Sequence, residues 1–234
     1  PMCQYSSTDG FADDWHLVHL GQFAIGGAGL VITEACAVSP AGRISPWDLG
    51  LWDDAHVPML ARITAFLRAQ GAASAVQLAH AGRKASAERP WAGGGPLPPA
   101  HPLAWPVVGP SAIPFADGWP VPHAMTDADI DATIADFVAA TRRADAAGFD
   151  AIELHGAHGY LLHAFLSPLS NARTDGWGGD RAGRMRFPLA VIDAVRDAWP
   201  AHKPLLLRVS ATDWVEGGWT LEDTLALACE ATAR

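Results

Sequence analysis

Short apolar runs recur along the chain, and each is bounded by glycine, proline or aspartate. The clearest are Leu30–Thr33, Ala75–Leu78, Ala151–Leu154 and Leu205–Val209. Their apolar residues are largely continuous rather than alternating with polar ones, which is typical of parallel strands covered on both faces. We interpret a stub at Met2 to Tyr5 as the end of one more strand.

Helical patterns separate these runs. Apolar residues there recur every three to four positions, and capping residues mark the ends. The predicted helices run from Asp13 to Ile25, from Asp53 or Asp54 to Gln70, from Thr126 to Gly148, along the stripe Phe187–Trp199, and onward from Thr220. The order is therefore β-α repeated five times.

This alternation predicts a parallel sheet, either an open doubly wound sheet or a (β/α)8 barrel. A dinucleotide-binding sheet carries G-x-G-x-x-G after its first strand, and the chain has none there. The glycines of Gly26–Gly29 precede a strand, so we interpret them as a helix-to-strand turn. The α/β class is thus expected to take the barrel form.

One connection is unusually long. Residues 79–125 hold ten of the eighteen prolines, together with Trp91, Trp105 and Trp119. A long loop without regular structure in a compact domain is usually a lid or a binding loop. We expect this Pro/Trp-rich insertion to fold back over the rest of the chain.

Composition narrows the class of protein. The 234 residues are 50% hydrophobic and carry a net charge of −9, which argues against disorder and against nucleic-acid or membrane partners. Cys3, Cys36 and Cys229 are far apart and odd in number, so we expect no disulfide framework and a cytoplasmic location. No apolar run reaches transmembrane length.

Polar residues gather where the predicted strands end. In chain order these are Cys3, Gln4 and Tyr5; Thr33, Glu34 and Cys36; Gln77 and His80; His155, His158 and Tyr160; and Arg208 and Ser210. The functional face of both barrels and open α/β sheets lies beyond the carboxyl ends of the strands. We expect these side chains to converge on one mouth.

His155, His158 and Tyr160 place two imidazoles and a phenol within six residues. Three interpretations stay open from spacing alone. The histidines could hold a developing oxyanion while Tyr160 supplies a proton. They could instead bind a metal, which needs a third ligand and a general base, or merely satisfy buried backbone groups.

Three further residues each allow two interpretations. Arg208 lies in an apolar strand and needs an anionic partner, either a core carboxylate or an electron-rich cofactor. Cys3 is either a nucleophile or a small buried thiol. Gln77 offers a donor and an acceptor to a planar heterocycle or to neighbouring backbone.

Several motifs resemble those of the old yellow enzyme family, in the family's order and along nearly the whole chain. They are Pro1–Tyr5, Thr33–Ala35, Gln77–Lys84, His155–Leu161, Phe165–Asp175 and Arg208–Ser210. Cys3 and the continuation Arg83–Ala85 point to the bacterial branch of xenobiotic reductases and thermophilic-like ene-reductases. So does the segment that begins at Arg89.

The resemblance implies an FMN-containing (β/α)8 barrel that takes hydride from NADPH or NADH and reduces activated alkenes. Such substrates are α,β-unsaturated carbonyl or nitro compounds. By resemblance His155 and His158 would bind the substrate oxygen, Tyr160 would protonate the α-carbon, and Tyr5 would add a hydrogen bond. The implied flavin contacts are Pro1, Met2, Cys3, Ala35, Gln77 and Arg208, and no metal site is implied.

The resemblance also sets an expectation for the domain. Residues 1–234 would form the first five β-α units of a barrel with an insertion at 79–125, and strands 6–8 would be absent. In the family, the segments that bind the FMN phosphate belong to strands 6–8. We therefore expect the 234 residues alone to bind FMN more weakly and to be less stable. We expect a homo-oligomer at full length.

Two alternatives stand beside this hypothesis. A metal-dependent barrel hydrolase would use His155, His158 and His80 and would hold a stoichiometric metal. A non-catalytic domain would keep the core but bind no cofactor, which FMN dialysis would reveal.

Overall fold

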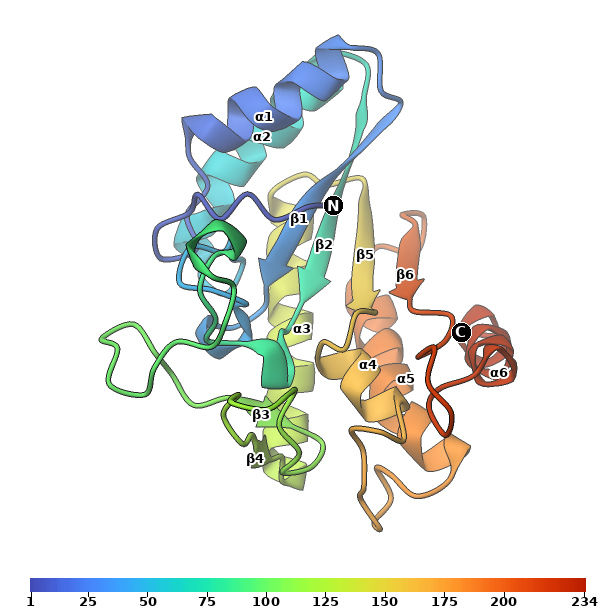
Figure 1. Ribbon diagram of the computed structural model, residues 1–234. Helices are drawn as coiled ribbons and strands as arrows, with labels where there is room; N and C mark the ends of the chain where they lie inside the picture. Colours follow the sequence, from blue (N-terminus) through green and yellow to red (C-terminus); the bar gives the residue numbers. More distant parts are fainter.

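The computed structural model describes residues 1–234 and contains one four-stranded parallel sheet (Figure 1). Its strands are β1 (Leu30–Ala37), β2 (Ala73–Ala79), β5 (Ala151–Gly156) and β6 (Leu205–Val209), and they lie side by side in that order. The order never reverses, so the sheet lacks the switch point of a doubly wound fold. This winding is that of a (β/α)8 barrel, as expected.

The helices confirm the predicted pattern. They are α1 (Asp14–Ile25), α2 (Val57–Ala69), α3 (Asp127–Ala146), α5 (Arg181–Ala198) and α6 (Leu221–Thr232). Asp13, Thr126 and Thr220 cap α1, α3 and α6 with side-chain hydrogen bonds to backbone N–H groups. A sixth helix, α4 (Leu161–Leu166), is not predicted by the pattern. All six of its residues are buried, so it has no polar face to reveal a helical period.

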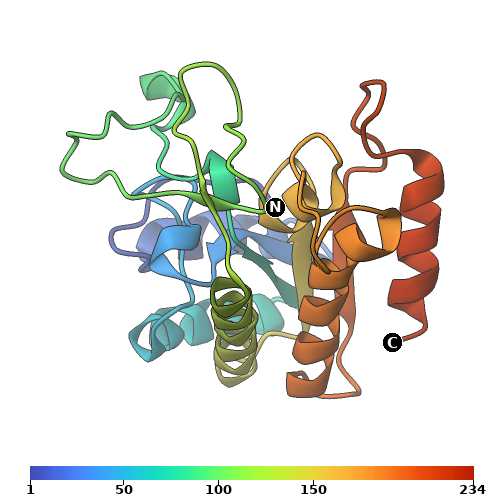
Figure 2. The same ribbon diagram turned by 90° about the horizontal axis from the view of Figure 1, so that it is seen from below.

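The sheet separates a hydrophobic core from a polar mouth. Figure 2 shows α2, α3 and α5 on one side of the strands, and the loops of residues 79–125 (green) on the other. Along β5, Ile152 and Leu154 are fully buried in the core that the sheet shares with the helices. Their neighbours Glu153 and His155 point the opposite way, because side chains alternate along a strand.

The predicted strand at Met2–Tyr5 is wrong. Residues 1–7 form no strand, and the backbone N–H of Gln4 donates to the Glu34 carboxylate at 2.8 Å instead of to a neighbouring strand. Tyr5 has a φ of 52°, which lies in the left-handed region and cannot continue a strand. The sheet therefore has four strands where the sequence pattern predicts five.

A β-bulge interrupts β1 just before the mouth. Ile32 pairs with Ala75 and Ala35 pairs with Gln77, so Thr33 and Glu34 together oppose the single residue Val76. A bulge of this kind bends the strand and re-aims the side chains that follow it. It leaves Cys36 fully buried opposite Leu78, and turns Ala35 toward the mouth.

The 79–125 insertion is more ordered than the sequence predicts. It contains 3₁₀ turns at Gly82–Lys84 and Pro90–Ala92, and two-residue strands β3 (Val108–Gly109) and β4 (His123–Ala124) that pair with each other. The guanidinium of Arg83 donates to the carbonyls of Ile113 and Pro114 and so joins two parts of the insertion. That these residues are an insertion into a partial barrel domain stays a prediction.

Candidate active site

A cavity of about 380 Å³ lies at the carboxyl ends of the strands. It is lined by all ten residues to which the family resemblance assigns a role: Pro1, Met2, Cys3, Tyr5, Ala35, Gln77, His155, His158, Tyr160 and Arg208. Ile44, Pro90 and Trp91 complete the wall and were not predicted to line it. Seven of the thirteen residues predicted at the strand ends therefore converge on one mouth, and the individual roles stay predictions. The prediction is wrong for the other six, which do not line the cavity: Gln4, Thr33, Glu34, Cys36, His80 and Ser210. Cys36 lies in the hydrophobic core instead, and the buried ring of His80 accepts the backbone N–H of Gly82.

Two imidazoles and a phenol form the centre of this cavity. The rings of His155 and His158 lie 5.0 Å apart between centroids and nearly perpendicular, and Tyr160 lies 5.0 Å from His155 and 6.4 Å from His158. Edge-to-face rings of this kind direct their polar atoms along different lines. A small ligand atom between them can meet more than one donor.

Both histidines are neutral at physiological pH. Burial, and after it the charges of His158 and Arg208, lowers the pKa of His155 to about 3. Burial followed by Arg208 likewise lowers the pKa of His158. The backbone N–H of Ala157 donates to Nδ1 of His155 at 3.3 Å, so the neutral ring carries its proton on Nε2.

Tyr160 keeps its proton as well. Burial, and to a smaller extent the neighbouring Cys3 and Tyr5, raises the pKa of its phenol well above the ordinary value. The Lys84 ammonium lies 4.9 Å from the centre of the Tyr160 ring and donates to the carbonyl of His158 at 2.9 Å. The site thus offers an O–H donor next to two neutral imidazoles.

Arg208 is the cation of the cavity, and it has no acidic partner. It stands opposite His155 in the register of β5 and β6, and its guanidinium makes no ion pair or hydrogen bond within the chain. Of the two partners that the sequence leaves open for Arg208, a core carboxylate is therefore not the one observed. A half-buried guanidinium without a counter-charge is suited to an anionic or electron-rich ligand.

Gln77 is oriented by a neighbouring carboxylate. Its Nε2 donates to Oε1 of Glu153 at 2.6 Å, on the strand beside it. Because that bond uses one of the two N–H donors of the amide, the second N–H and the carbonyl oxygen of Gln77 are left for a ligand. Gln77 and Arg208 therefore offer an acceptor and donors at one side of the cavity.

The thiol of Cys3 fits a packing role better than a nucleophilic one. Burial, and after it the charges of Asp48 and Glu34, raises its pKa well above the ordinary value. A thiol that stays protonated is a poor nucleophile. Its neighbour Gln4 is held by Glu34, whose other oxygen lies 3.4 Å from Nε2 of the buried His16.

The 79–125 insertion reaches this cavity. Trp91 meets Tyr5 edge to face, with 5.6 Å between ring centroids, and the Arg89 guanidinium lies 4.0 Å from the ring of Trp47. The tryptophans of the insertion were the sequence signal for these contacts, although the pattern alone did not say which one reaches the mouth. The expected fold-back is therefore seen at Pro90 and Trp91.

The alternative hypotheses find less support. No group of three or more His, Cys, Asp or Glu side chains is arranged to hold a metal ion, so His155 and His158 lack the third ligand a zinc hydrolase needs. A larger groove of about 490 Å³ lies between β6, α5 and α6, but nine of its thirteen lining residues are hydrophobic. It offers no set of converging polar groups.

No helix is long and apolar enough to cross a membrane.

Comparison with known proteins agrees with this geometry. The chain is 48% identical over 241 residues to an NADH:flavin oxidoreductase of Gibberella zeae, covering 97% of this chain and 58% of the relative. It is 45% identical over 225 residues to an NADPH dehydrogenase of Geobacillus thermodenitrificans, covering 95% and 61%. The chain thus spans about three fifths of the length of these curated relatives.

Solved structures give the same result. The old yellow enzyme of Pichia sp. AKU4542 superposes with a TM-score of 0.80 at 30% identity, over 95% of this chain and 57% of that one. Morphinone reductase in complex with tetrahydroNAD superposes with a TM-score of 0.82 at 26% identity, over 99% and 66%. The model of the NADH:flavin oxidoreductase / NADH oxidase family matches residues 1–234. The resemblance to old yellow enzymes is confirmed, and the chain belongs to the NADH:flavin oxidoreductase / NADH oxidase family.

Proposed function

We propose that the protein is an FMN-dependent oxidoreductase that takes hydride from NADPH or NADH and reduces activated C=C bonds. Its substrates would be α,β-unsaturated carbonyl or nitro compounds. The observation that carries the proposal is the cavity in which two neutral imidazoles, a protonated phenol and an unpaired guanidinium meet. Membership of a flavin oxidoreductase family supports it.

The residues present fit a flavin ring. The guanidinium of Arg208 lacks a counter-charge, and the carbonyl oxygen of Gln77 is left free by Glu153. These two groups would hold the polar edge of the ring, with Pro1, Met2, Cys3 and Ala35 as neighbours. When bound, FMN would supply the hydride transfer, which is chemistry that side chains do not perform.

The substrate would be bound by its oxygen. Nε2–H of His155 and the ring N–H of neutral His158 would donate to a carbonyl or nitro oxygen, and Tyr5 would add a third donor. Donors placed in advance at a developing negative charge lower the barrier for its formation. Tyr160 would give its phenolic proton to the α-carbon.

Expression from the complete reading frame tests the proposal. A yellow protein is expected, with flavin absorbance that NADPH or NADH bleaches and that 2-cyclohexen-1-one restores. A colourless protein that takes up no FMN on dialysis would contradict it. Chelator treatment is expected to leave turnover unchanged, whereas a metal-dependent hydrolase would lose it.

Assembly and location are part of the same proposal. Trp15, Val18, Phe23 and Ile25 of α1 are large apolar side chains with roughly half or more of their surface exposed, which supports a homo-oligomer at full length. The three unpaired cysteines support a cytoplasmic location. The net charge of −9 supports small-molecule partners rather than nucleic acid.

A further inference from the structure

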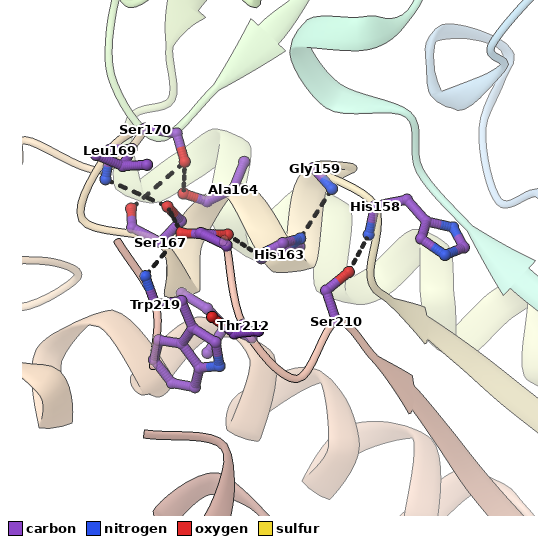
Figure 3. A network of polar contacts seen from close by, with 12 residues as sticks. His158, Gly159, His163, Ala164, Ser167, Leu169, Ser170, Ser210, Thr212 and Trp219 are labelled. Carbon is purple, nitrogen blue, oxygen red and sulfur yellow. Dashed lines mark hydrogen bonds and ion pairs between the residues drawn. The ribbon is translucent and has the colours of Figure 1, made fainter. Parts of the chain in front are cut away.

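A partly buried polar network joins the loops that follow β5 and β6 (Figure 3). The first loop carries His158 and Gly159 and leads into α4, which contains His163. The second carries Ser210 and Asp213. Hydrogen bonds connect the two loops at His158 and at His163, so neither loop can move far without the other.

The first loop has an unfavourable backbone. His158 has a φ of 62° and Gly159 a φ of 74°, which places two consecutive residues in the left-handed region. A residue with a Cβ rarely adopts that region, and it persists only where surrounding contacts enforce it. The direction of the His158 ring and the position of Tyr160 both depend on this turn, because the turn lies between β5 and Tyr160.

Three contacts hold the turn. The backbone N–H of His158 donates to Oγ of Ser210 at 2.9 Å, and the Lys84 ammonium donates to the His158 carbonyl. The backbone N–H of Gly159 donates to Nδ1 of His163 at 2.8 Å (Figure 3). The last contact is the most buried, since the His163 residue is 6% exposed.

Asp213 orients the His163 ring so that its Nδ1 faces the backbone N–H of Gly159. Because Nδ1 accepts from Gly159, the neutral ring carries its proton on Nε2, which donates to Oδ1 of Asp213 at 2.9 Å. The other carboxylate oxygen accepts from Ser167 Oγ at 2.6 Å and from the backbone N–H of Trp219 at 2.7 Å. Burial opposes ionisation, but these hydrogen bonds outweigh it and lower the pKa of Asp213 to about 2.

We propose that His163 and Asp213 are positioning residues, which set the left-handed turn at His158–Gly159 and thereby aim the His158 imidazole and the Tyr160 phenol into the cavity. Neither residue lines the cavity. The effect on ligand binding rests on the function proposed above. The effect on the turn does not, and the two can be measured separately.

Two substitutions at His163 separate its two hydrogen bonds. In His163→Asn the side-chain oxygen can take the place of Nδ1 and accept from Gly159, but the contact with Asp213 is lost. In His163→Gln the longer amide can donate to Asp213, but no acceptor faces Gly159. Asp213→Asn keeps the shape and places an amide donor against the Ser167 hydroxyl or the Trp219 N–H. His202→Gln, at an exposed histidine outside both loops, is the control.

The first measurement is amide hydrogen exchange at Gly159 by NMR in the full-length protein without FMN. The second is the dissociation constant of phenol, read from its charge-transfer band in the FMN-loaded full-length protein. We expect H163Q to exchange about tenfold faster at Gly159 than H163N and to bind phenol about tenfold more weakly. D213N should also exchange faster at Gly159 and bind phenol more weakly than the unsubstituted protein, and H202Q should match the unsubstituted protein in both measurements.

Equal exchange at Gly159 in H163N, H163Q and the unsubstituted chain would overturn the proposal, whatever the phenol result. Phenol affinities that follow only the melting temperatures of the variants would overturn it as well. If the full-length protein takes up no FMN, the proposed function fails, and the exchange measurement still decides the role of His163. If H163Q does not fold, the comparison of D213N with the unsubstituted chain decides, since exchange unchanged in D213N would contradict the proposal.

Discussion

The two sides of one turn hold histidines in opposite settings. His155, before the turn, has no carboxylate partner, and burial together with His158 and Arg208 lowers its pKa to about 3. His163, after the turn, is bound at both ring nitrogens, to a backbone N–H on one side and to Asp213 on the other. The first imidazole keeps an N–H group free for a ligand, whereas the second has none left.

This difference shows how one residue type serves two purposes within nine positions. A ring that must bind a ligand needs a free donor and a surrounding that keeps it neutral. A ring that must hold backbone in place needs both nitrogens occupied. Hydrogen-bond partners therefore separate a binding histidine from a structural one better than burial does, since both residues are less than 7% exposed.

The largest expected effect is a loss of stability when the structural histidine His163 loses its partner Asp213. Asp213→Ala leaves the donors of His163, Ser167 and Trp219 without an acceptor, and breaking such a buried pair costs about 3 kcal/mol of unfolding free energy. Urea unfolding at pH 7 measures the loss. A cost below that of Asp54→Ala, which removes an exposed ion pair with Arg143, would show that the network is not structural.

Substitutions at the ligand-binding histidines, His155 and His158, should weaken the affinity for phenol. In the FMN-loaded protein, His155→Ala combined with His158→Ala removes two N–H donors to a phenolate oxygen, and phenol affinity is expected to fall about a hundredfold. Titration of the charge-transfer band measures it, with His202→Ala as control. An undiminished band in the double variant would refute the assigned role of the pair.

His155 and Asp213 should change the stability of the protein in different pH ranges. The pKa of His155 is depressed, so below the ordinary pKa of about 6.5 the unfolded chain binds a proton that the folded chain does not. Its contribution to stability is complete above pH 6.5 and declines as pH falls toward 3. His155→Asn should therefore reduce the loss of stability between pH 7 and 5 by about 2 kcal/mol.

Asp213 should act at lower pH. Its folded pKa of about 2 lies below the value of the unfolded chain, so its contribution is present above about pH 4 and is lost as pH falls toward 2. Asp213→Asn should show its stability deficit in full at pH 5 to 7, and a smaller deficit near pH 2. A deficit that shrinks already between pH 7 and 5 would reverse the assignment of the two windows.

The smallest effect is expected at the hydrogen bond between the backbone N–H of His158 and Oγ of Ser210, which joins the two loops. Ser210→Ala removes the acceptor for the N–H of His158 in an exposed position, so water can replace it and the cost is about 0.5 kcal/mol. Thermal unfolding measures it, and phenol affinity should change by less than about threefold. A loss as large as that of Asp213→Ala would show that Ser210, rather than His163, holds the turn.

Much of this arrangement could be predicted from the sequence. Helix starts were marked by Asp13, Thr126 and Thr220, whose side chains act on backbone only two or three positions away. The cavity residues could be grouped because parallel strands end at a common edge. Both inferences need only local signals and one general rule of topology.

The misses need information from further along the chain. Met2–Tyr5 resembles a strand end, but a carboxylate 30 residues away takes up the N–H of Gln4, and Tyr5 turns left-handed. Asp213 meets a histidine 50 residues earlier. A lone aspartate in a loop carries no periodic signal, so its pairing becomes visible only when the two loops are placed side by side.

The bulge at Thr33–Glu34 also determines how β1 would respond to the loss of a residue. Deleting one of the two would restore an unbroken ladder in which Ala35 still pairs with Gln77 and Cys36 with Leu78, so the later side chains of the strand would keep their faces. The loss would fall instead on the contacts of the deleted residue, because Thr33 Oγ1 accepts from the backbone N–H of Gln77 and the Glu34 carboxylate accepts from that of Gln4. A single-codon deletion here would therefore act on the segments that line the cavity and leave the core face of β1 in place.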